Sequence, residues 1–444
     1  MALFLQPPSG SQYVRHRPER GLLYRTVETY WPVFLRERER VGKGLPHFIR
    51  DEFDQFLCCG IPEFGFVRTY CRQCRKSGIV AFSCKKRGFC PSCCSRRMND
   101  TAAHIVDHVV PEVPLRQWVL SFPYGLRFQM AHSPELTNQV LRAFIQTVAS
   151  FQRKRAKQRG IGGAHLGSIT FIQRFGSALN LNVHFHSLVT DGVFRRLGDG
   201  EFKFVRLPEP SQDELLEVVN KIQTKVQRLS CRLGFNEEDQ LGFDEESLGD
   251  LAAISIAHKA GFGDRLGRKL KRYGVHGIER YPESRDPYSV NIEGFSLNAR
   301  VWIAGRDRMK VEKLIRYMSR GPIATERLSQ SYPNLLLYRM KTPWRDGTTH
   351  VSFSPLDFIA RLVALIPPPK MNLIRYHGVF APNFKGRQLI VPKGQKAKAK
   401  TPEGDRQTHE EIRRERMRWS DMLKRTFKID VTVCPRCKGR VEQI

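Results

Sequence analysis

The chain has 444 residues, 41% of them hydrophobic and 10% aromatic, which is enough to fill two or three packed domains. Its 74 Lys and Arg against 44 Asp and Glu give a formal net charge of +30, which favours nucleic acid as the partner. A membrane surface or an acidic protein is the weaker alternative, because the sequence shows no basic amphipathic anchor, no run of 18 apolar residues and no export signal. We therefore expect a cytoplasmic protein without a membrane partner.

Helical and strand patterns alternate along the chain after a basic lead-in at 1–50, in which 21–40 is the clearest helical run. The strand patterns at 168–176 and 178–194 flank a Gly-Ser turn, and this arrangement predicts a β-hairpin. Further helices are expected at 98–110, 134–158, 211–233, 308–320 and 355–366, and further strands at 115–122, 294–305 and 349–353. We expect a loop at 375–383, a basic linker at 393–400 and an arginine-rich helix at 405–428.

Cysteines cluster near the N-terminus, where eight of the eleven lie between Cys58 and Cys94. Without an export signal, paired Cys-x-x-Cys motifs indicate a metal site more than a disulfide framework. Two such motifs, 15 residues apart, have zinc-ribbon spacing and predict one closed site for a structural Zn²⁺ ion. The predicted ligands are Cys71, Cys74, Cys90 and Cys93.

Other cysteines leave the ligand set partly open. Cys84 or Cys94 is a candidate replacement for one ligand, although buried free cysteines are also common. Cys434 and Cys437 form a third Cys-x-x-Cys motif that amounts to half a zinc site, and its role is open.

The cysteine module is strongly basic, with nine Lys or Arg and no acid from Arg68 to Met98. We expect this surface to contact DNA phosphates, with Lys85, Lys86 and Arg87 as candidate contacts. The alternative is a zinc module that only stabilises the fold, because a basic surface is not itself a contact.

A His-Phe-His motif lies within the second strand of the predicted hairpin. Alternation places Phe185 towards the core and His184 and His186 together on the opposite, more polar face. Their Cα atoms are about 6.6 Å apart in a strand, so both imidazoles can reach one cation. Two surface histidines on a half-exposed strand are the alternative interpretation.

Tyr317 lies in a predicted helix, with Arg316 and Arg320 beside it on the more polar side. A phenol can attack phosphorus at neutral pH when positive charge and a metal-polarised phosphate are close. By itself, a tyrosine in such a helix is more often a packing residue than a nucleophile. Together with the histidine pair and the basic scaffold, it indicates metal-assisted cleavage of a phosphodiester by tyrosine.

Several ordered blocks carry a family resemblance. Among them are VAFSCKKRGFCPSCCSRRM, FIQRFGSALNLNVHFHSLVTDGVF, LIRYMSRGPIATERL, YRMKTPWRDGTTHVSF and RYHGVFAPN. From about residue 50 onwards, the chain resembles the rolling-circle insertion-sequence transposases of family ninety-one and their common-region relatives, which are HUH endonucleases.

The resemblance implies a reaction and its residues. It implies that His184 and His186 bind a divalent Mg²⁺ or Mn²⁺ and that Tyr317 attacks single-stranded DNA at the element ends, forming a covalent 5′-phosphotyrosine. Gln173 is the candidate third metal ligand, because it shares the histidine face if the hairpin turn is tight. The founding members have two catalytic tyrosines on one helix, whereas this chain has Lys313 and Gly321 a turn away from Tyr317. How one tyrosine completes a second strand transfer is therefore open.

The expected fold is α+β, with an N-terminal zinc ribbon and an HUH-type antiparallel sheet backed by helices. We expect a lead-in at 1–50, a zinc-binding domain at 51–100, a catalytic domain at 101–345 and a basic C-terminal region at 346–444. The predicted function is a bacterial, nucleoid-associated DNA transposase of undetermined oligomeric state. The alternatives are a plasmid replication initiator or relaxase with the same chemistry, a non-catalytic zinc-containing DNA-binding protein, and an inactive transposase.

Overall fold

The computed structural model describes residues 16–198, 200–234, 248–274, 286–344, 346–392, 419–427 and 430–444. The α-helices are α1 (Leu22–Arg40), α2 (His47–Cys58), α3 (Pro91–His108), α4 (Tyr124–His132), α5 (Pro134–Gln158), α6 (Gln212–Arg232), α7 (Gly249–Ile256), α8 (Arg308–Ser319), α9 (Pro355–Leu365), α10 (Arg387–Ile390) and α12 (Trp419–Phe427). Short 3-10 helices are η1 (Pro18–Arg20), η2 (Pro62–Phe64), η4 (Gly263–Arg265) and η5 (Thr325–Arg327).

The strands form four sheets. The described strands are β1 (Phe66–Cys71), β2 (Ser77–Ala81), β3 (Leu115–Ser121), β4 (Ala164–His165), β5 (Gly167–Phe175), β6 (Leu181–Thr190), β7 (Gly192–Arg196), β8 (Phe202–Arg206), β9 (Arg272–Gly274), β10 (Ser289–Ile292), β11 (Phe295–Asn298), β12 (Trp302–Ile303), β13 (Leu328–Tyr332), β14 (Leu335–Arg339), β15 (Thr348–Phe353), β16 (Ile374–Gly378) and β17 (Val441–Gln443). The predicted α+β class is confirmed.

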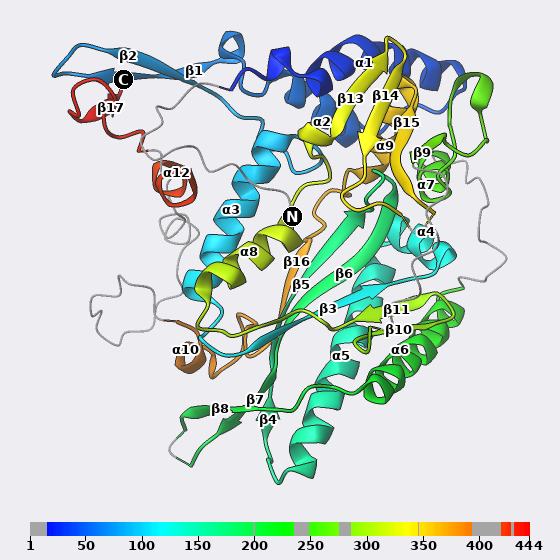
Figure 1. Ribbon diagram of the computed structural model, residues 1–444, viewed down its shortest axis with the longest axis vertical. Helices are drawn as coiled ribbons and strands as arrows, with labels where there is room; N and C mark the ends of the chain where they lie inside the picture. The colour runs from blue at the N-terminus through cyan, green and yellow to red at the C-terminus, as the bar shows by residue number, and fades with distance from the viewer. Residues whose placement is uncertain are drawn as a thin grey trace.

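A seven-stranded antiparallel sheet forms the centre of the molecule (Figure 1). Its order is β10-β11-β3-β6-β5-β16, and β12 also pairs with β3. The predicted hairpin is its middle: β5 pairs antiparallel with β6, and the turn is tight enough for Gln173 to lie opposite His184. Three smaller sheets, β17-β1-β2, β13-β14-β15-β9 and β4-β7-β8, surround it.

Helices cover both faces of the central sheet, so both faces are buried. On one face, Val183 and Phe185 of β6 belong to a core that includes residues of α4, α5, α6 and α7. On the other face, Leu188 of β6 packs in a second core with Ile105 of α3 and Ile315 of α8. The alternative that His184 and His186 lie on a half-exposed strand is therefore wrong, because α3 and α8 lie over the polar face of β6 (Figure 1).

Most predicted elements are present, and the differences concern pairing partners distant in sequence. The helices expected at 134–158, 211–233 and 308–320 are α5, α6 and α8. The expected strand at 294–305 is divided between β11 and β12, both of which pair with β3. The expected loop at 375–383 is wrong at its start, because β16 pairs with β5 and forms an edge of the central sheet.

The end of the chain returns to its beginning. Strand β17 pairs antiparallel with β1, and the C-terminus lies beside the β1–β2 hairpin (Figure 1). The predicted boundary at residue 346 does not follow the sheets, since β16 belongs to the central sheet and β17 to the N-terminal one. The expected linker at 393–400 and the first part of the arginine-rich helix, 405–418, lie outside the described residues, whereas 419–427 is helical. None of the described helices is long and apolar enough to span a membrane.

Candidate active site and cysteine clusters

The two histidines of β6 face each other at the polar side of the central sheet. Their Nε2 atoms are 3.1 Å apart, and the Nδ1–H of His184 donates to the backbone oxygen of Asn182 at 2.8 Å. His186 Nδ1 lies 2.9 Å from the side-chain nitrogen of Gln117, a buried residue of β3. In this arrangement Gln117 donates to Nδ1, and the Nε2–H of His186 donates to His184.

The pair fits one divalent cation. Two nitrogens about 2.1 Å from one ion and 3.1 Å apart subtend about 95° at that ion, close to the 90° of neighbouring octahedral ligands. Loading such an ion displaces the proton shared by the two Nε2 atoms, and the amide of Gln117 must then rotate so that its oxygen accepts from His186 Nδ1–H. No local pattern in the sequence predicts that Gln117 lies beside His186.

Burial keeps both imidazoles neutral near pH 7. The pKa of His184 is lowered to about 4, mainly by burial and also by the nearby Arg127 and Arg320. The pKa of His186 is lowered well below its usual value, mainly by burial and also by His184 and Arg320. Neutral imidazole is the form that ligates metals.

Tyr317 lies on α8 directly against this pair. Its ring meets the His186 ring edge-on, with centroids 5.8 Å apart and an interplanar angle of 85°. The apolar side of this helix is buried through Val311, Ile315 and Met318. The ring of Tyr317 stays 38% exposed, so a substrate can reach it.

Gln173 connects the sheet to this helix. Its side-chain nitrogen donates to the backbone oxygens of Met318 at 2.7 Å and Tyr317 at 3.3 Å. Among the described residues, no third His, Cys, Asp or Glu joins the histidine pair in a metal-binding group. The oxygen of Gln173 and the buried, unpaired side-chain oxygen of Asn182 are further polar groups of that face.

Two cations lie over the Tyr317 ring without an acidic partner among the described residues. Lys341 Nζ lies 4.4 Å from the centre of the tyrosine ring, and the Arg320 guanidinium lies 5.3 Å from it. Burial lowers the pKa of Lys341, with further contributions from Arg320 and Arg327. The Nε atoms of Arg320 and Arg327 are buried and unpaired. Such a site attracts an anion, and a phosphate group fits its cations.

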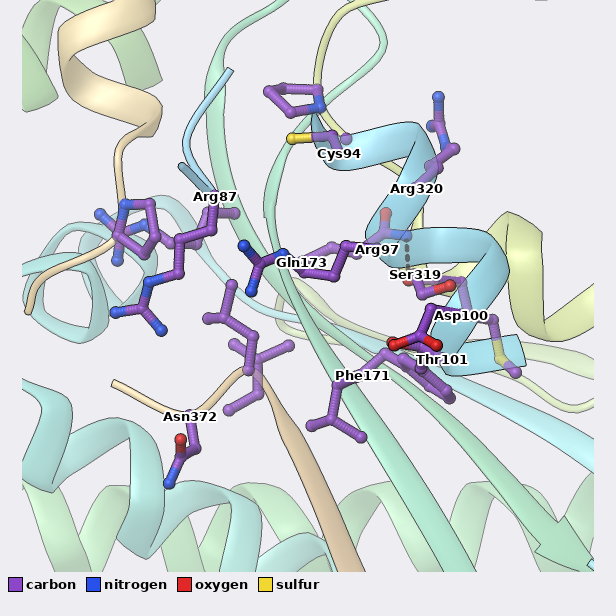
Figure 2. A pocket seen from close by; sticks show the side chains of 18 of the residues that line it. Arg87, Cys94, Arg97, Asp100, Thr101, Phe171, Gln173, Ser319, Arg320 and Asn372 are labelled. Carbon is purple, nitrogen blue, oxygen red and sulfur yellow. Dashed lines mark hydrogen bonds between the residues drawn. The ribbon is translucent and has the colours of Figure 1, made fainter. Parts of the chain in front are cut away.

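A cavity of about 960 Å³ opens beside the end of α8. Its walls come from α3, β5, the residues that follow α8 and the segment before β16. Figure 2 shows Gln173 in this space, with Arg87 on one side of it and Arg97 and Ser319 on the other. The cavity is therefore bordered by the residues that hold and follow the tyrosine helix.

The other predicted DNA contacts have different surroundings. Arg316 forms an ion pair with Glu312, and Lys86 with Asp51, so both are engaged within the protein. Arg87 donates to the backbone oxygens of Pro368 and Met371 and also lines the cavity. Lys85 is exposed. Of the predicted basic residues, Arg320 is the one that lies against Tyr317.

The cysteines form two tetrathiolate clusters, and this corrects the predicted ligand set. Cys71 and Cys74 lie in the turn between β1 and β2, whereas Cys90 and Cys93 lie at the start of α3, and the two motifs do not converge. Each motif recruits a different pair. The clusters are Cys59, Cys84, Cys90 and Cys93, and Cys71, Cys74, Cys434 and Cys437.

The first cluster has the geometry of a structural zinc site. Its Sγ atoms are 3.4 Å apart between Cys84 and Cys93, 3.6 Å between Cys59 and Cys90 and 3.7 Å between Cys59 and Cys93. Tetrahedral zinc with bonds of about 2.3 Å holds its sulfurs about 3.8 Å apart, so small shifts would admit the ion. Hydrogen bonds from neighbouring thiols, chiefly Cys59, lower the pKa of Cys93, which favours the thiolate that zinc requires.

Comparison with known families accounts for both parts of the chain. The family model described as "Putative transposase" matches residues 167–388, half of the chain, and the model described as "Transposase zinc-binding domain" matches residues 26–122. The chain therefore belongs to the IS91-type transposases, whose substrate is DNA, and its N-terminal part is a zinc-binding domain. The zinc-domain match begins before the predicted boundary at 51 and contains the whole first cluster. No curated protein and no solved structure gives a significant match.

Proposed function

We propose that this transposase nicks and rejoins single-stranded DNA at insertion-sequence ends through a covalent 5′-phosphotyrosine on Tyr317. The observation that carries the proposal is the contact of the Tyr317 ring with His186, within a cluster of cations that lack acidic partners. A tyrosine that only packed would not need a neutral histidine pair on one side and buried, unpaired guanidinium nitrogens nearby.

The nicking step exchanges one phosphate ester for another. The Tyr317 oxygen attacks the phosphorus, the new Tyr–O–P bond forms, and the bond from phosphorus to the 3′-oxygen breaks. The phenolic proton leaves to solvent, and the departing 3′-oxygen takes up a proton. Arg320 and Lys341 bind the phosphate oxygens and orient the phosphorus towards the tyrosine.

A divalent cation, Mg²⁺ or Mn²⁺, would be held by His184 and His186 and would polarise a non-bridging phosphate oxygen. Gln173, the candidate third ligand, has its side-chain nitrogen engaged with the end of α8, so we assign it the role of positioning that helix. The backbone oxygen of Asn182 and the amide of Gln117 fix the two rings, so the nitrogens stay aimed at a common point.

Joining is the reverse of nicking. A 3′-hydroxyl attacks the phosphotyrosine, a new phosphodiester forms and the tyrosine oxygen leaves with a proton. The energy of the original ester is kept in the protein–DNA bond, so no nucleotide hydrolysis is needed. We place this activity in the bacterial cytoplasm on nucleoid DNA, and the cavity beside α8 is the proposed route of the strand.

The test is formation of a covalent adduct with labelled single-stranded DNA from the element ends in the presence of Mg²⁺ or Mn²⁺. Tyr317→Phe removes one oxygen and keeps the ring, so we expect no adduct, with folding, zinc content and DNA binding unchanged. Tyr332→Phe, on an exposed tyrosine of β13, is the matched control and should form the adduct at the wild-type rate.

The alternatives give different results in this assay. A nuclease that activates water would still cut as Tyr317→Phe and would leave free ends. Adduct formation retained in Tyr317→Phe but lost in Tyr376→Phe would move the nucleophile to β16. DNA binding without any cleavage by the wild type would favour a non-catalytic or inactive protein. A replication initiator or relaxase shares the chemistry, and preference for insertion-sequence ends over a plasmid origin separates them.

A further inference from the structure

Four cysteines from opposite ends of the chain meet beside the β1–β2 hairpin. Cys71 Sγ lies 3.5 Å from Cys437 Sγ across 366 positions of sequence, and Cys74 Sγ lies 3.5 Å from Cys434 Sγ across 360. All four sulfurs lie within 4.8 Å of one another. Cys434 and Cys437 fall outside both family matches, so the family does not account for them.

The sulfur distances suit a metal rather than disulfide bonds. A disulfide requires about 2.05 Å between sulfurs, whereas tetrahedral zinc with bonds of about 2.3 Å spaces them about 3.8 Å apart. The observed 3.5 Å contacts are close to the second value. A closed set of four thiolates selects zinc or iron among the common metals and leaves no open position for catalysis.

The backbone of the two motifs supports this assignment independently. The N–H of Cys71 donates to the oxygen of Lys76, and the N–H of Cys434 donates to the oxygen of Gly439, the same offset of five residues. The residue after each second cysteine, Arg75 and Lys438, has a left-handed φ, of 57° and 62° respectively. That conformation is strained for any residue other than glycine, so two identical turns indicate a shared constraint.

We propose that Cys71, Cys74, Cys434 and Cys437 hold a second structural zinc ion, which fastens the C-terminal end of the chain to the zinc-binding domain. The remaining attachment there is slight: β17 pairs with β1 over three residues, and the Arg72–Glu442 ion pair is exposed. Three strand pairs and one exposed ion pair stabilise little, so the metal would supply most of this link. The inference does not rest on the proposed nicking reaction.

The link has a consequence for the tyrosine helix. Helix α12, just before the Cys434 motif, carries Arg425, which forms ion pairs with Asp107 of α3 and Glu312 of α8. Glu312 also pairs with Arg316, the residue next to Tyr317. A zinc ion at the C-terminal motif therefore holds α12 against the helix that presents the proposed nucleophile.

Metal content of the full chain, purified with reducing agent and reconstituted with Zn²⁺, tests the proposal. We expect the wild type to hold one more zinc ion per chain than Cys434→Ser/Cys437→Ser, measured by elemental analysis. The double variant changes only the end of the chain and leaves the buried first cluster intact, and its folding is checked by circular dichroism. Cys231→Ser, on an exposed cysteine of α6 outside both clusters, is the matched control and should keep the wild-type content.

Equal zinc content in the wild type and the double variant would overturn the proposal. Replacement of zinc by Co²⁺ gives a second readout, since tetrahedral cobalt thiolate absorbs visible light, and the absorbance per chain should fall in the double variant. Tyr317→Phe should retain the full zinc content, so failure of the second site and failure of the nicking mechanism are distinguishable.

Discussion

Replacing Gln173 by Met tests whether this residue positions the tyrosine helix or ligates the cation. Gln173 is 5% exposed, and its amide donates to two backbone oxygens in the last turn of α8. The last carbonyls of a helix have no partner within it. Methionine keeps the length and packing of glutamine but leaves the Met318 oxygen unpaired in a buried place.

The expected cost follows from that contact. In Gln173→Met the buried backbone oxygen of Met318 loses its hydrogen bond, and this should lower the free energy of unfolding by about 1–3 kcal/mol. Released from the sheet, the end of α8 would shift, and displacement of a nucleophile by about 1 Å costs on the order of 10²-fold in rate. We therefore expect slower adduct formation at every Mn²⁺ concentration, with an unchanged half-saturating concentration.

The assay combines urea unfolding with adduct formation over a Mn²⁺ titration. Gln223→Met is the matched control. Gln223 is a buried glutamine of α6, which packs on the face of the sheet opposite α8, and its side-chain nitrogen donates to Glu293. The control variant should lose stability without a loss of rate at the active site. Unchanged stability of Gln173→Met together with a tenfold or larger rise in half-saturating Mn²⁺ would refute the positioning role and identify Gln173 as a ligand.

Three further outcomes are expected. Burial lowers the pKa of His184, His258 and His377 to about 4, so between about pH 6.5 and 4 the unfolded chain takes up protons that the folded chain does not. The free energy of unfolding should therefore fall over this range, by up to about 1.4 kcal/mol per pH unit for each histidine. Urea unfolding of cation-free protein at several pH values measures this loss. His186→Ala should abolish nicking but spare most single-strand binding in a filter assay, and parallel loss of both would make the pair structural. Arg320→Met should reduce the slope of log affinity against log salt by about 0.7, and an unchanged slope would remove Arg320 from the phosphate contacts.

The sequence alone determined the elements whose signals are local. The apolar period of α5 and α8 and the alternation of β5 and β6 define each element and its buried face, because these patterns repeat within one helix or strand. Tight pairing of that hairpin places Gln173 opposite His184, as the short turn suggested. The family blocks likewise indicated the transposase class before any contact was known.

Only the tertiary structure decided the contacts between distant segments. Cys-x-x-Cys spacing shows that two sulfurs lie on one side of a turn, but it does not show which other pair completes the tetrahedron, so Cys71 and Cys74 could not be assigned to the C-terminal motif. The residues of β16 show no clear alternation of apolar and polar side chains, so the sequence does not distinguish them from a loop. They form a strand because they pair with β5. Gln117 of β3 and Lys341, which follows β14, reach the candidate active site from other parts of the chain, where the local sequence carries no sign of their neighbours. Sequence patterns report periodicity along the chain, whereas these contacts depend on how the sheets and helices pack against one another.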